Sequence, residues 1–387
     1  MSTAITLSLF LVAFAVAAGT FVCSRQLHIW LLPWLHRRLR REDAPPGVTD
    51  IMICVADHFE PGLDGVSYEH ECRRVREWAC RYPLLANRHS DSDGRVPQHT
   101  FFYPQEEYRP EHLDTLAELC QRGYGDVEIH LHHDRDTAAN LRAKLESFKQ
   151  ILRYRHGLLH QNPCTGDIEY AFIHGNWALD NSDGGRNCGV DHELAVLRDT
   201  GCYADMTLPS APGPGQTRKV NSIYYAAEDG LPKSHDSGVD VRAGRKPSGD
   251  LLILQGPLSL NFSSRKWGIL PRIENGELSG DNPPAPERAR LWVEEAIHVA
   301  GRPNWLFIKL HTHGANENNM EALLGKHMDD TLSFLEHAFN DHVRYRLHYV
   351  TAREMYNIVK AAENGADGNA GAYRQFRKDR QREGIRA

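Results

Sequence analysis

The chain alternates short apolar runs with longer stretches in which apolar residues recur every three or four positions. The short runs predict buried strands, and the periodic stretches predict helices that pack over them. The predicted strands are residues 51–56, 100–103, 126–132, 170–173, 251–254, 305–310 and 346–350. The predicted helices are residues 68–85, 111–122, 137–154, 192–199, 286–300 and 351–359. This alternation indicates an α/β protein whose parallel strands are flanked by helices, either as a layer or as a barrel.

A longer apolar segment stands near the N-terminus. Residues 4–23 carry no charge over 20 positions, which is enough for a helix to cross about 30 Å of hydrocarbon. No basic residue precedes this segment, as one would in a cleaved signal peptide, so we predict an uncleaved transmembrane anchor.

The residues after the apolar segment favour a membrane interface. Residues 24–49 contain Trp30 and Trp34 beside a group of arginines, which predicts a basic interfacial segment and a linker. Because the positive charge follows the span, we predict a single-pass membrane protein whose catalytic domain lies in the cytoplasm. The alternative is an ordinary amphipathic helix that packs on the domain.

The rest of the chain divides into a body and a tail. We expect residues 50–360 to form one catalytic domain, since the linker before it ends in a Pro- and Gly-containing stretch. Within this domain, residues 210–250 are rich in Gly, Pro, Ser and charged residues and predict a long insertion loop. Residues 361–387 combine small residues with a basic end and predict a flexible tail.

Charge and cysteine content narrow the function classes. The 387 residues have a net charge of −6, but residues 42–373 alone hold 34 basic and 49 acidic residues, a net charge of −15. A body this acidic is unsuited to bind nucleic acid, whose phosphates attract Lys and Arg. The eight cysteines form no CxxC zinc pattern, and we expect mostly buried thiols in a reducing compartment.

Histidine is the unusual component, because the chain has 22 and several stand at predicted strand ends beside Asp, Glu and Asn. The strand-end sequences are Asp57-His58-Phe59-Glu60-Pro61, Glu128-Ile129-His130-Leu131-His132-His133-Asp134-Arg135-Asp136, His174-Gly175-Asn176-Trp177 and His311-Thr312-His313-Gly314. The carboxyl ends of parallel strands meet at one edge, where sites are built. Imidazole and carboxylate groups suit Zn²⁺ in an open catalytic site, with Co²⁺, Ni²⁺ and Mn²⁺ as alternatives.

The order of these motifs resembles the polysaccharide deacetylase family, also called the NodB-homology family. The resemblance covers roughly residues 50–360 and rests on the first, second and third strand-end sequences and on Leu310-His311. It implies an α/β fold with a distorted (β/α) barrel, here preceded by the N-terminal transmembrane helix. It also implies an enzyme that removes N- or O-acetyl groups from sugars with a divalent metal.

The resemblance implies a metal site and a general base. Asp57 matches the general base of the family, and His58 stands where the family has a metal-binding Asp. His132 matches the first His of the family's His-Thr-x-x-His motif, and Asp136 stands in place of the second. The implied ligands are therefore His58, His132 and Asp136. His130 is an alternative to Asp136, because residues 130 and 132 share one face of a strand.

The remaining roles concern the general acid and the substrate. The family ends its closing strand with a His that acts as general acid, which is here either His311 or His313. The substrate-binding positions implied by the resemblance are His174, Asn176, Trp177 and Asp205. The usual Arg-x-Pro of the third motif is absent, and an ordinary turn aspartate is the alternative interpretation of Asp205.

These implications lead to a specific functional prediction. We expect a membrane-anchored, metal-dependent hydrolase that removes acetyl groups from a saccharide or a lipid-linked glycan precursor in polysaccharide or envelope metabolism. Polysaccharide-synthesis proteins are the expected protein partners. One alternative is a metal-dependent phosphoester hydrolase, although no phosphate-cradling Gly-rich loop is present. The other is a non-catalytic, deacetylase-like component of a polysaccharide synthesis complex.

Overall fold

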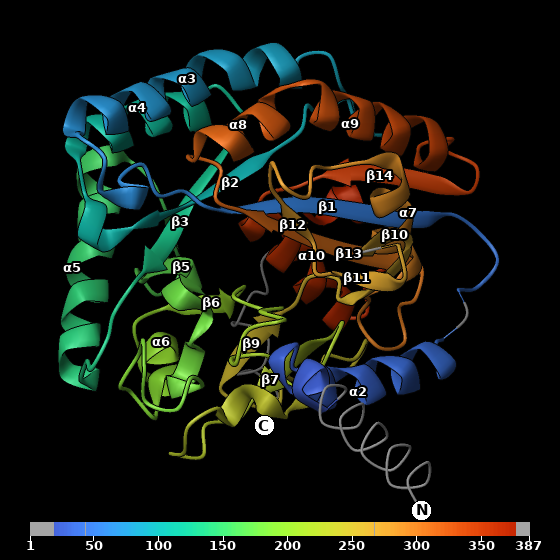
Figure 1. Ribbon diagram of the computed structural model, residues 1–387. Helices are drawn as coiled ribbons and strands as arrows, with labels where there is room; N and C mark the ends of the chain where they lie inside the picture. The colour runs from blue at the N-terminus through green and yellow to red at the C-terminus, as the bar shows by residue number, and fades with distance from the viewer. Residues whose placement is uncertain (1–18, 43, 267, 377–387) are drawn as a thin grey trace, which may run out of the picture.

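A mixed sheet of 12 strands, most of them parallel, forms the centre of the computed structural model, which describes residues 19–42, 44–266 and 268–376 (Figure 1). The hydrogen-bonded path runs β12-β13-β1-β2-β3-β5-β6-β9-β7-β8, while β14 pairs with β1 and β4 with β5. The strands are β1 Thr49–His58, β2 His99–Pro104, β3 Gly125–Leu131, β4 His160–Gln161, β5 Ile168–His174, β6 Cys202–Asp205, β7 Ile223–Ala226, β8 Val239–Asp240, β9 Leu251–Leu254, β12 Glu277–Leu278, β13 Trp305–Thr312 and β14 Tyr345–Tyr349. A separate two-stranded sheet pairs β10 (Ser259–Lys266) with β11 (Leu270–Glu274).

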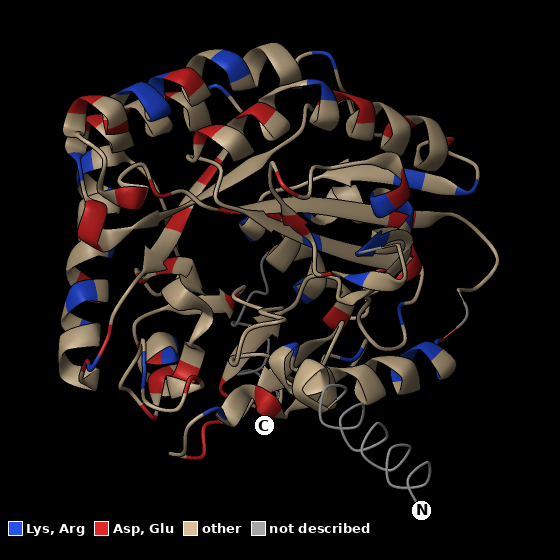
Figure 2. Cartoon of the chain, viewed as in Figure 1, with Lys and Arg blue, Asp and Glu red and all other residues tan. Residues whose placement is uncertain are grey.

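Helices cover the sheet on both faces. They are α2 Leu27–Leu39, α3 Tyr68–Ala86, α4 Pro110–Gln121, α5 Ala138–His156, α6 Glu193–Asp199, α7 Pro286–Glu294, α8 Glu317–Leu324, α9 Lys326–Phe339 and α10 Ala352–Glu363. Figure 1 shows α3, α4, α8 and α9 along one side of the sheet, and α10 on the other side, behind β1. Acidic and basic residues are interspersed on these outer helices (Figure 2), as on an ordinary solvated surface.

The two faces of the sheet build two different cores because side chains alternate along each strand. In β1, Ile51, Ile53 and Val55 join the larger core beneath the outer helices. The residues between them, such as Met52 and Cys54, face a second core that includes residues of α10. Burial on both faces explains why β1 is apolar throughout its length rather than alternating. We call the side of the second core the inner face of the sheet.

The α/β class predicted from the hydrophobic pattern is confirmed, and each predicted strand and helix has a counterpart. The capping box forms as expected, with Thr351 and Glu354 exchanging side-chain to backbone hydrogen bonds. The helix predicted over residues 286–300 ends earlier, at Glu294. The distorted barrel is not shown, because within the described residues the path of paired strands begins at β12 and ends at β8.

The N-terminal membrane anchor requires a correction. Within residues 19–42, 44–266 and 268–376, no helix has the length and apolar character needed to cross a bilayer. This finding overturns the fold class that begins with a transmembrane helix, and with it the single-pass membrane location of a cytoplasmic domain. Residues 4–18 of the predicted span 4–23 lie outside the described residues.

The predicted interfacial segment contains α2, which packs on the body. Trp30 and Trp34 are buried in a small core that also holds residues between positions 211 and 258. The indole N–H of Trp34 donates to Glu295 Oε2 at 3.0 Å, and Arg38 donates to the other oxygen of that carboxylate. The two Trp rings therefore complete a protein core, as the alternative interpretation of an amphipathic packed helix requires.

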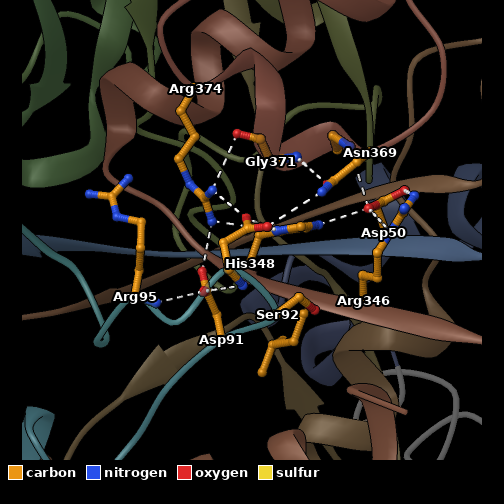
Figure 3. A network of polar contacts seen from close by, with 12 residues as sticks. Asp50, Asp91, Ser92, Arg95, Arg346, His348, Asn369, Gly371 and Arg374 are labelled. Carbon is orange, nitrogen blue, oxygen red and sulfur yellow. Dashed lines mark hydrogen bonds and ion pairs between the residues drawn. The ribbon is translucent and has the colours of Figure 1, made fainter. Parts of the chain in front are cut away.

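Two segments predicted to be irregular contribute ordered structure. Residues 210–250 contain β7 and β8, which extend one edge of the sheet. In the predicted tail 361–387, Ala370 is fully buried, and the guanidinium of Arg374 binds Asp91 and Asp93 (Figure 3). The described part of the tail, up to residue 376, is therefore docked on the body, and residues 377–387 lie outside the described residues.

Candidate metal centre

One group of side chains at the carboxyl ends of β1, β3 and β13 places a carboxylate among four histidines. It consists of His58, Glu60, His130, His132 and His313, and we call it the Glu60 cluster. The candidate ligand atoms of His58, Glu60 and His313 lie within 4.8 Å of one another, as do those of Glu60, His130 and His132. These described residues can hold a metal ion, and Glu60 belongs to both sets.

Strand register and alternation bring these residues together. The register of β1 against β13 pairs Ala56 with His311. Two positions further along each strand, the rings of His58 and His313 lie on the inner face with centroids 4.7 Å apart. His130 faces the same side from β3, and its ring centroid lies 4.8 Å from that of His58.

The hydrogen bonds of the cluster orient the imidazoles as metal sites require. The Nδ1–H of His130 donates to the carbonyl oxygen of Ile173 at 2.9 Å, while its Nε2 lies 2.9 Å from Glu60 Oε1. His132 repeats the pattern, with Nδ1 on Glu106 and Nε2 3.1 Å from the same Glu60 oxygen. A ring that donates from both nitrogens here is an imidazolium, and a cation at the Glu60 oxygen would take the place of the Nε2 proton. Metal-binding histidines typically show this arrangement.

The protonation states also suit a cation. Burial, reinforced by His313 and His130, holds the pKa of His58 well below its usual range, so the ring is neutral at pH 7. Its Nε2 is buried without a hydrogen-bond partner. Burial alone would raise the pKa of Glu60, but hydrogen bonds from His130 and His132 outweigh it and lower that pKa. Burial alone would lower the pKa of His132, but hydrogen bonds to Glu106 and Glu60 outweigh it and raise that pKa to about 10, so this ring would release a proton on binding a metal. The cluster therefore offers an ionised carboxylate and one neutral imidazole, the forms that bind divalent metals.

The cluster is open on one side. Glu60, His58 and His130 are buried, whereas His132 and His313 are half-buried. The side chain of His132 keeps 33% of its surface exposed. Catalytic metal sites keep a position free for water or substrate, in contrast to structural sites closed by four protein ligands.

Trp177 and His311 lie beside the cluster. The half-buried ring of Trp177 has its centroid 4.6 Å from that of His58 and 4.9 Å from that of His311. His311 is buried on the inner face of β13, and its Nδ1 has no hydrogen-bond partner. Burial, reinforced by the charge of Lys309, lowers the pKa of His311 well below its usual range. The structure thus places a neutral imidazole with an unused nitrogen next to an aromatic surface.

Asp57 lies on the other face of β1 and does not join the cluster. Its Oδ2 accepts a hydrogen bond from His99 Nε2 at 2.8 Å, and its Oδ1 accepts one from the backbone N–H of Gly314 at 2.6 Å. A Cβ at Gly314 would lie 2.2 Å from Asp57 Oδ2, so this close approach requires glycine. The carboxylate predicted to be the general base therefore holds the turn that follows His313.

Asp136 is also separate from the Glu60 cluster. Its carboxylate accepts hydrogen bonds from Asn140, from Lys144 and from the backbone of Thr137, and its Oδ2 lies 3.5 Å from His133 Nδ1. Of the two alternatives for the third ligand, the structure brings His130 next to His132 and places Asp136 beside His133.

The other predicted substrate-binding residues are dispersed. His174 is fully buried on the side of the sheet opposite to the inner face, where its ring is tilted against that of His133, with the centroids 4.6 Å apart. Asn176 is exposed. Asp205 is fully buried and accepts two hydrogen bonds from Thr207, and burial raises its pKa to about 7. Only Trp177 of this set borders the cluster.

Glu60 is the main site residue that the sequence interpretation missed. It lies two positions after His58. The same alternation that grouped His130 with His132 would have placed it on the inner face. Glu106, which orients His132, comes from the turn after β2 and has no comparable signal in the sequence.

Comparisons with known protein families and with curated proteins found no match. No protein-family model matches the chain, and no curated protein matches it. The resemblance to polysaccharide deacetylases therefore stays a prediction that rests on the motifs.

Proposed function

We propose that the protein is a metal-dependent hydrolase that removes acetyl groups from a saccharide. The observation that carries this proposal is the Glu60 cluster, a half-open set of one carboxylate and four imidazoles at the carboxyl ends of parallel strands. The order of the motifs supports the choice of a deacetylase among metal-dependent hydrolases.

Glu60 would hold the ion together with neighbouring histidines. Because the two possible ligand sets share Glu60, we propose one ion, bound by Glu60 together with His58 and His313 or together with His130 and His132, which leaves a position free. Nitrogen and oxygen donors suit Zn²⁺, with Co²⁺, Ni²⁺ and Mn²⁺ as substitutes. When bound, such an ion polarises a carbonyl oxygen and lowers the pKa of water from about 15.7 to about 7.

We assign proton transfer to His311. Its imidazole is neutral at pH 7 and can take a proton from the attacking water; its lowered pKa makes it a weak base but, once protonated, a strong acid toward the leaving amine or alcohol. The unpartnered Nδ1 is the atom available for this role. Asp57 acts as a positioning residue, because its bond to the Gly314 N–H fixes the turn after His313.

Trp177→Ala is expected to raise KM for the saccharide about tenfold, with a smaller change in kcat. The indole ring offers an apolar surface at the edge of the cluster, and the loss of about 1.4 kcal/mol of apolar contact corresponds to a tenfold weaker affinity. Steady-state kinetics measures the effect, and Trp177→Phe should keep most of the affinity. An unchanged KM in the Ala variant would remove Trp177 from the substrate site.

Product analysis tests the proposal as a whole. The purified chain is loaded with Zn²⁺ and incubated with N-acetylated oligosaccharides, O-acetylated oligosaccharides and a phosphoester. Release of acetate that stops on chelation and returns with Zn²⁺ supports the deacetylase. Metal-dependent release of phosphate instead would favour a phosphoester hydrolase. Bound metal without turnover of any of these substrates would favour a non-catalytic component.

A further inference from the structure

A second group of potential metal ligands lies on the side of the sheet opposite to the inner face, toward the larger core. It consists of His133, His174, Cys188 and Glu193, and we call it the Glu193 cluster. All four residues are buried, and their candidate ligand atoms lie within 4.8 Å of one another. Since successive residues of an extended chain point to opposite sides, His132 faces the Glu60 cluster while His133 faces this one.

The spacing of the Glu193 cluster fits a tetrahedral ion. Glu193 Oε1 lies 3.0 Å from His133 Nε2, and Glu193 Oε2 lies 3.6 Å from His174 Nε2 and 3.4 Å from the sulfur of Cys188. Zinc binds nitrogen or oxygen at about 2.0–2.2 Å and sulfur at about 2.3 Å, so tetrahedral ligand atoms stand roughly 3.3–3.8 Å apart. To form a closed site, the contact between His133 and Glu193 would lengthen slightly, and the other ligand atoms, all within 4.8 Å of one another, would adjust around the ion.

The imidazole nitrogens of His174 and His133 and the groups beside them also favour a metal site. The Nε2 of His174 is fully buried, faces the cluster and has no hydrogen-bond partner within the part of the chain that the structure describes. The Nδ1 of His174 contacts the carbonyl of Gly175, whereas the Nδ1 of His133 has no hydrogen-bond partner among the described residues, with Asp136 Oδ2 3.5 Å away. A carbonyl or carboxylate behind the second nitrogen is the arrangement that orients imidazoles on a metal.

Charge balance favours a dication. Burial raises the pKa of Cys188 well above its usual range, and its thiol donates to Glu193. A bound divalent ion would displace that proton and neutralise the thiolate and carboxylate charges in this buried site. Four protein ligands and no open position are typical of structural zinc sites rather than catalytic ones.

We propose that His133, His174, Cys188 and Glu193 bind a structural zinc ion, distinct from the ion proposed for the Glu60 cluster. The site joins the ends of β3 and β5 to the start of α6 and to the loop between β5 and α6. In that loop, Trp177 and Asn187 are among the residues with positive φ, a conformation that persists only where the surroundings enforce it. Gly189 packs so closely on the loop after β3 that a Cβ would lie 2.7 Å from the Asp136 nitrogen.

Cobalt substitution of the intact chain tests the site without any variant. Co²⁺ bound to a thiolate gives a ligand-to-metal charge-transfer absorption band in the near ultraviolet. Co²⁺ bound to His and Glu alone lacks this band. We expect this absorption in the wild-type chain, together with the loss of one metal equivalent per chain in Cys188→Ser. Cys202→Ser is the matched control, because Cys202 is another buried thiol whose sulfur lies by the carbonyl of Ala204.

The two metal proposals can fail independently. Glu60→Gln should keep the thiolate-to-cobalt absorption, whereas Cys188→Ser should lose it and keep the metal of the Glu60 cluster. A wild-type chain that binds cobalt without the thiolate absorption overturns the Glu193 site, and so does a Cys188→Ser variant that retains the absorption. Because the first of these measurements uses the unmodified chain, a variant that fails to fold leaves the proposal testable.

Discussion

Glu60→Gln is expected to remove the metal from the Glu60 cluster and to lower kcat/KM for acetate release by about a thousandfold or more. The amide keeps the shape of the side chain but removes the negative charge that both possible ligand sets share. A bound metal contributes several kcal/mol to catalysis, and each 1.36 kcal/mol changes the rate tenfold. Metal content by mass spectrometry and steady-state kinetics on the acetylated saccharide measure the two effects.

The control for this variant changes the same residue type elsewhere. Glu118 lies on the exposed side of α4, so Glu118→Gln should leave metal content and kcat/KM unchanged. Circular dichroism establishes that both variants are folded. If Glu60→Gln retains a full equivalent of metal at the Glu60 cluster and wild-type turnover, the cluster is not the catalytic centre and the proposed function fails with it.

The strands were predictable because their burial leaves a direct trace in the sequence. In β1, both faces are packed, so residues 51–56 are apolar without interruption and cannot be solvent-exposed structure. The capping box at Thr351 is likewise local, since both hydrogen bonds join residues three positions apart. Closure of the sheet depends instead on which strands pair at its edges, and no local pattern encodes that choice.

The N-terminal segment was misread because two environments select the same residues. Trp beside Arg is typical of a bilayer interface, where the indole N–H reaches a headgroup. In this protein, the N–H of Trp34 reaches Glu295, and Arg38 pairs with the same carboxylate. The partner lies 261 positions away in the sequence, so the pattern around Trp34 alone does not distinguish the two environments.

Site residues were predictable as far as strand alternation extends. His58, His130 and His132 were expected near one another, and they share the inner face. The place of Asp136 depends on the turn after β3, where Arg135 adopts a positive φ. Alternation no longer applies beyond that turn, and Asp136 reaches His133 on the opposite side.

Asp50→Ala is expected to lower the free energy of unfolding by about 3–5 kcal/mol, the cost of removing one partner of a buried ion pair. Asp50 is the second residue of β1 and is fully buried. Both of its oxygens accept hydrogen bonds from Arg346 of β14, at 2.8 and 2.7 Å, and His348 Nε2 donates to it at 2.7 Å (Figure 3). Urea denaturation of the wild type and the variant measures the difference.

The matched control is Asp330→Ala, which breaks an exposed pair with Lys326 on α9 and should cost less than about 0.5 kcal/mol. Equal losses in the two Asp variants would contradict the prediction.

The contacts of Asp50 also extend to the end of the described chain. His348 joins Asp50 to Asp93, which binds Arg374 in the docked C-terminal segment. Because these groups share partners, the losses in the free energy of unfolding caused by Asp50→Ala and by Arg374→Ala should not add. The loss in the double variant should differ from the sum of the two single losses by about 0.5 kcal/mol or more. His58 lies at the other end of β1, about 26 Å away at 3.3 Å per residue. Folded Asp50→Ala should therefore bind metal at the Glu60 cluster like the wild type, which separates this loss of stability from any loss of the site.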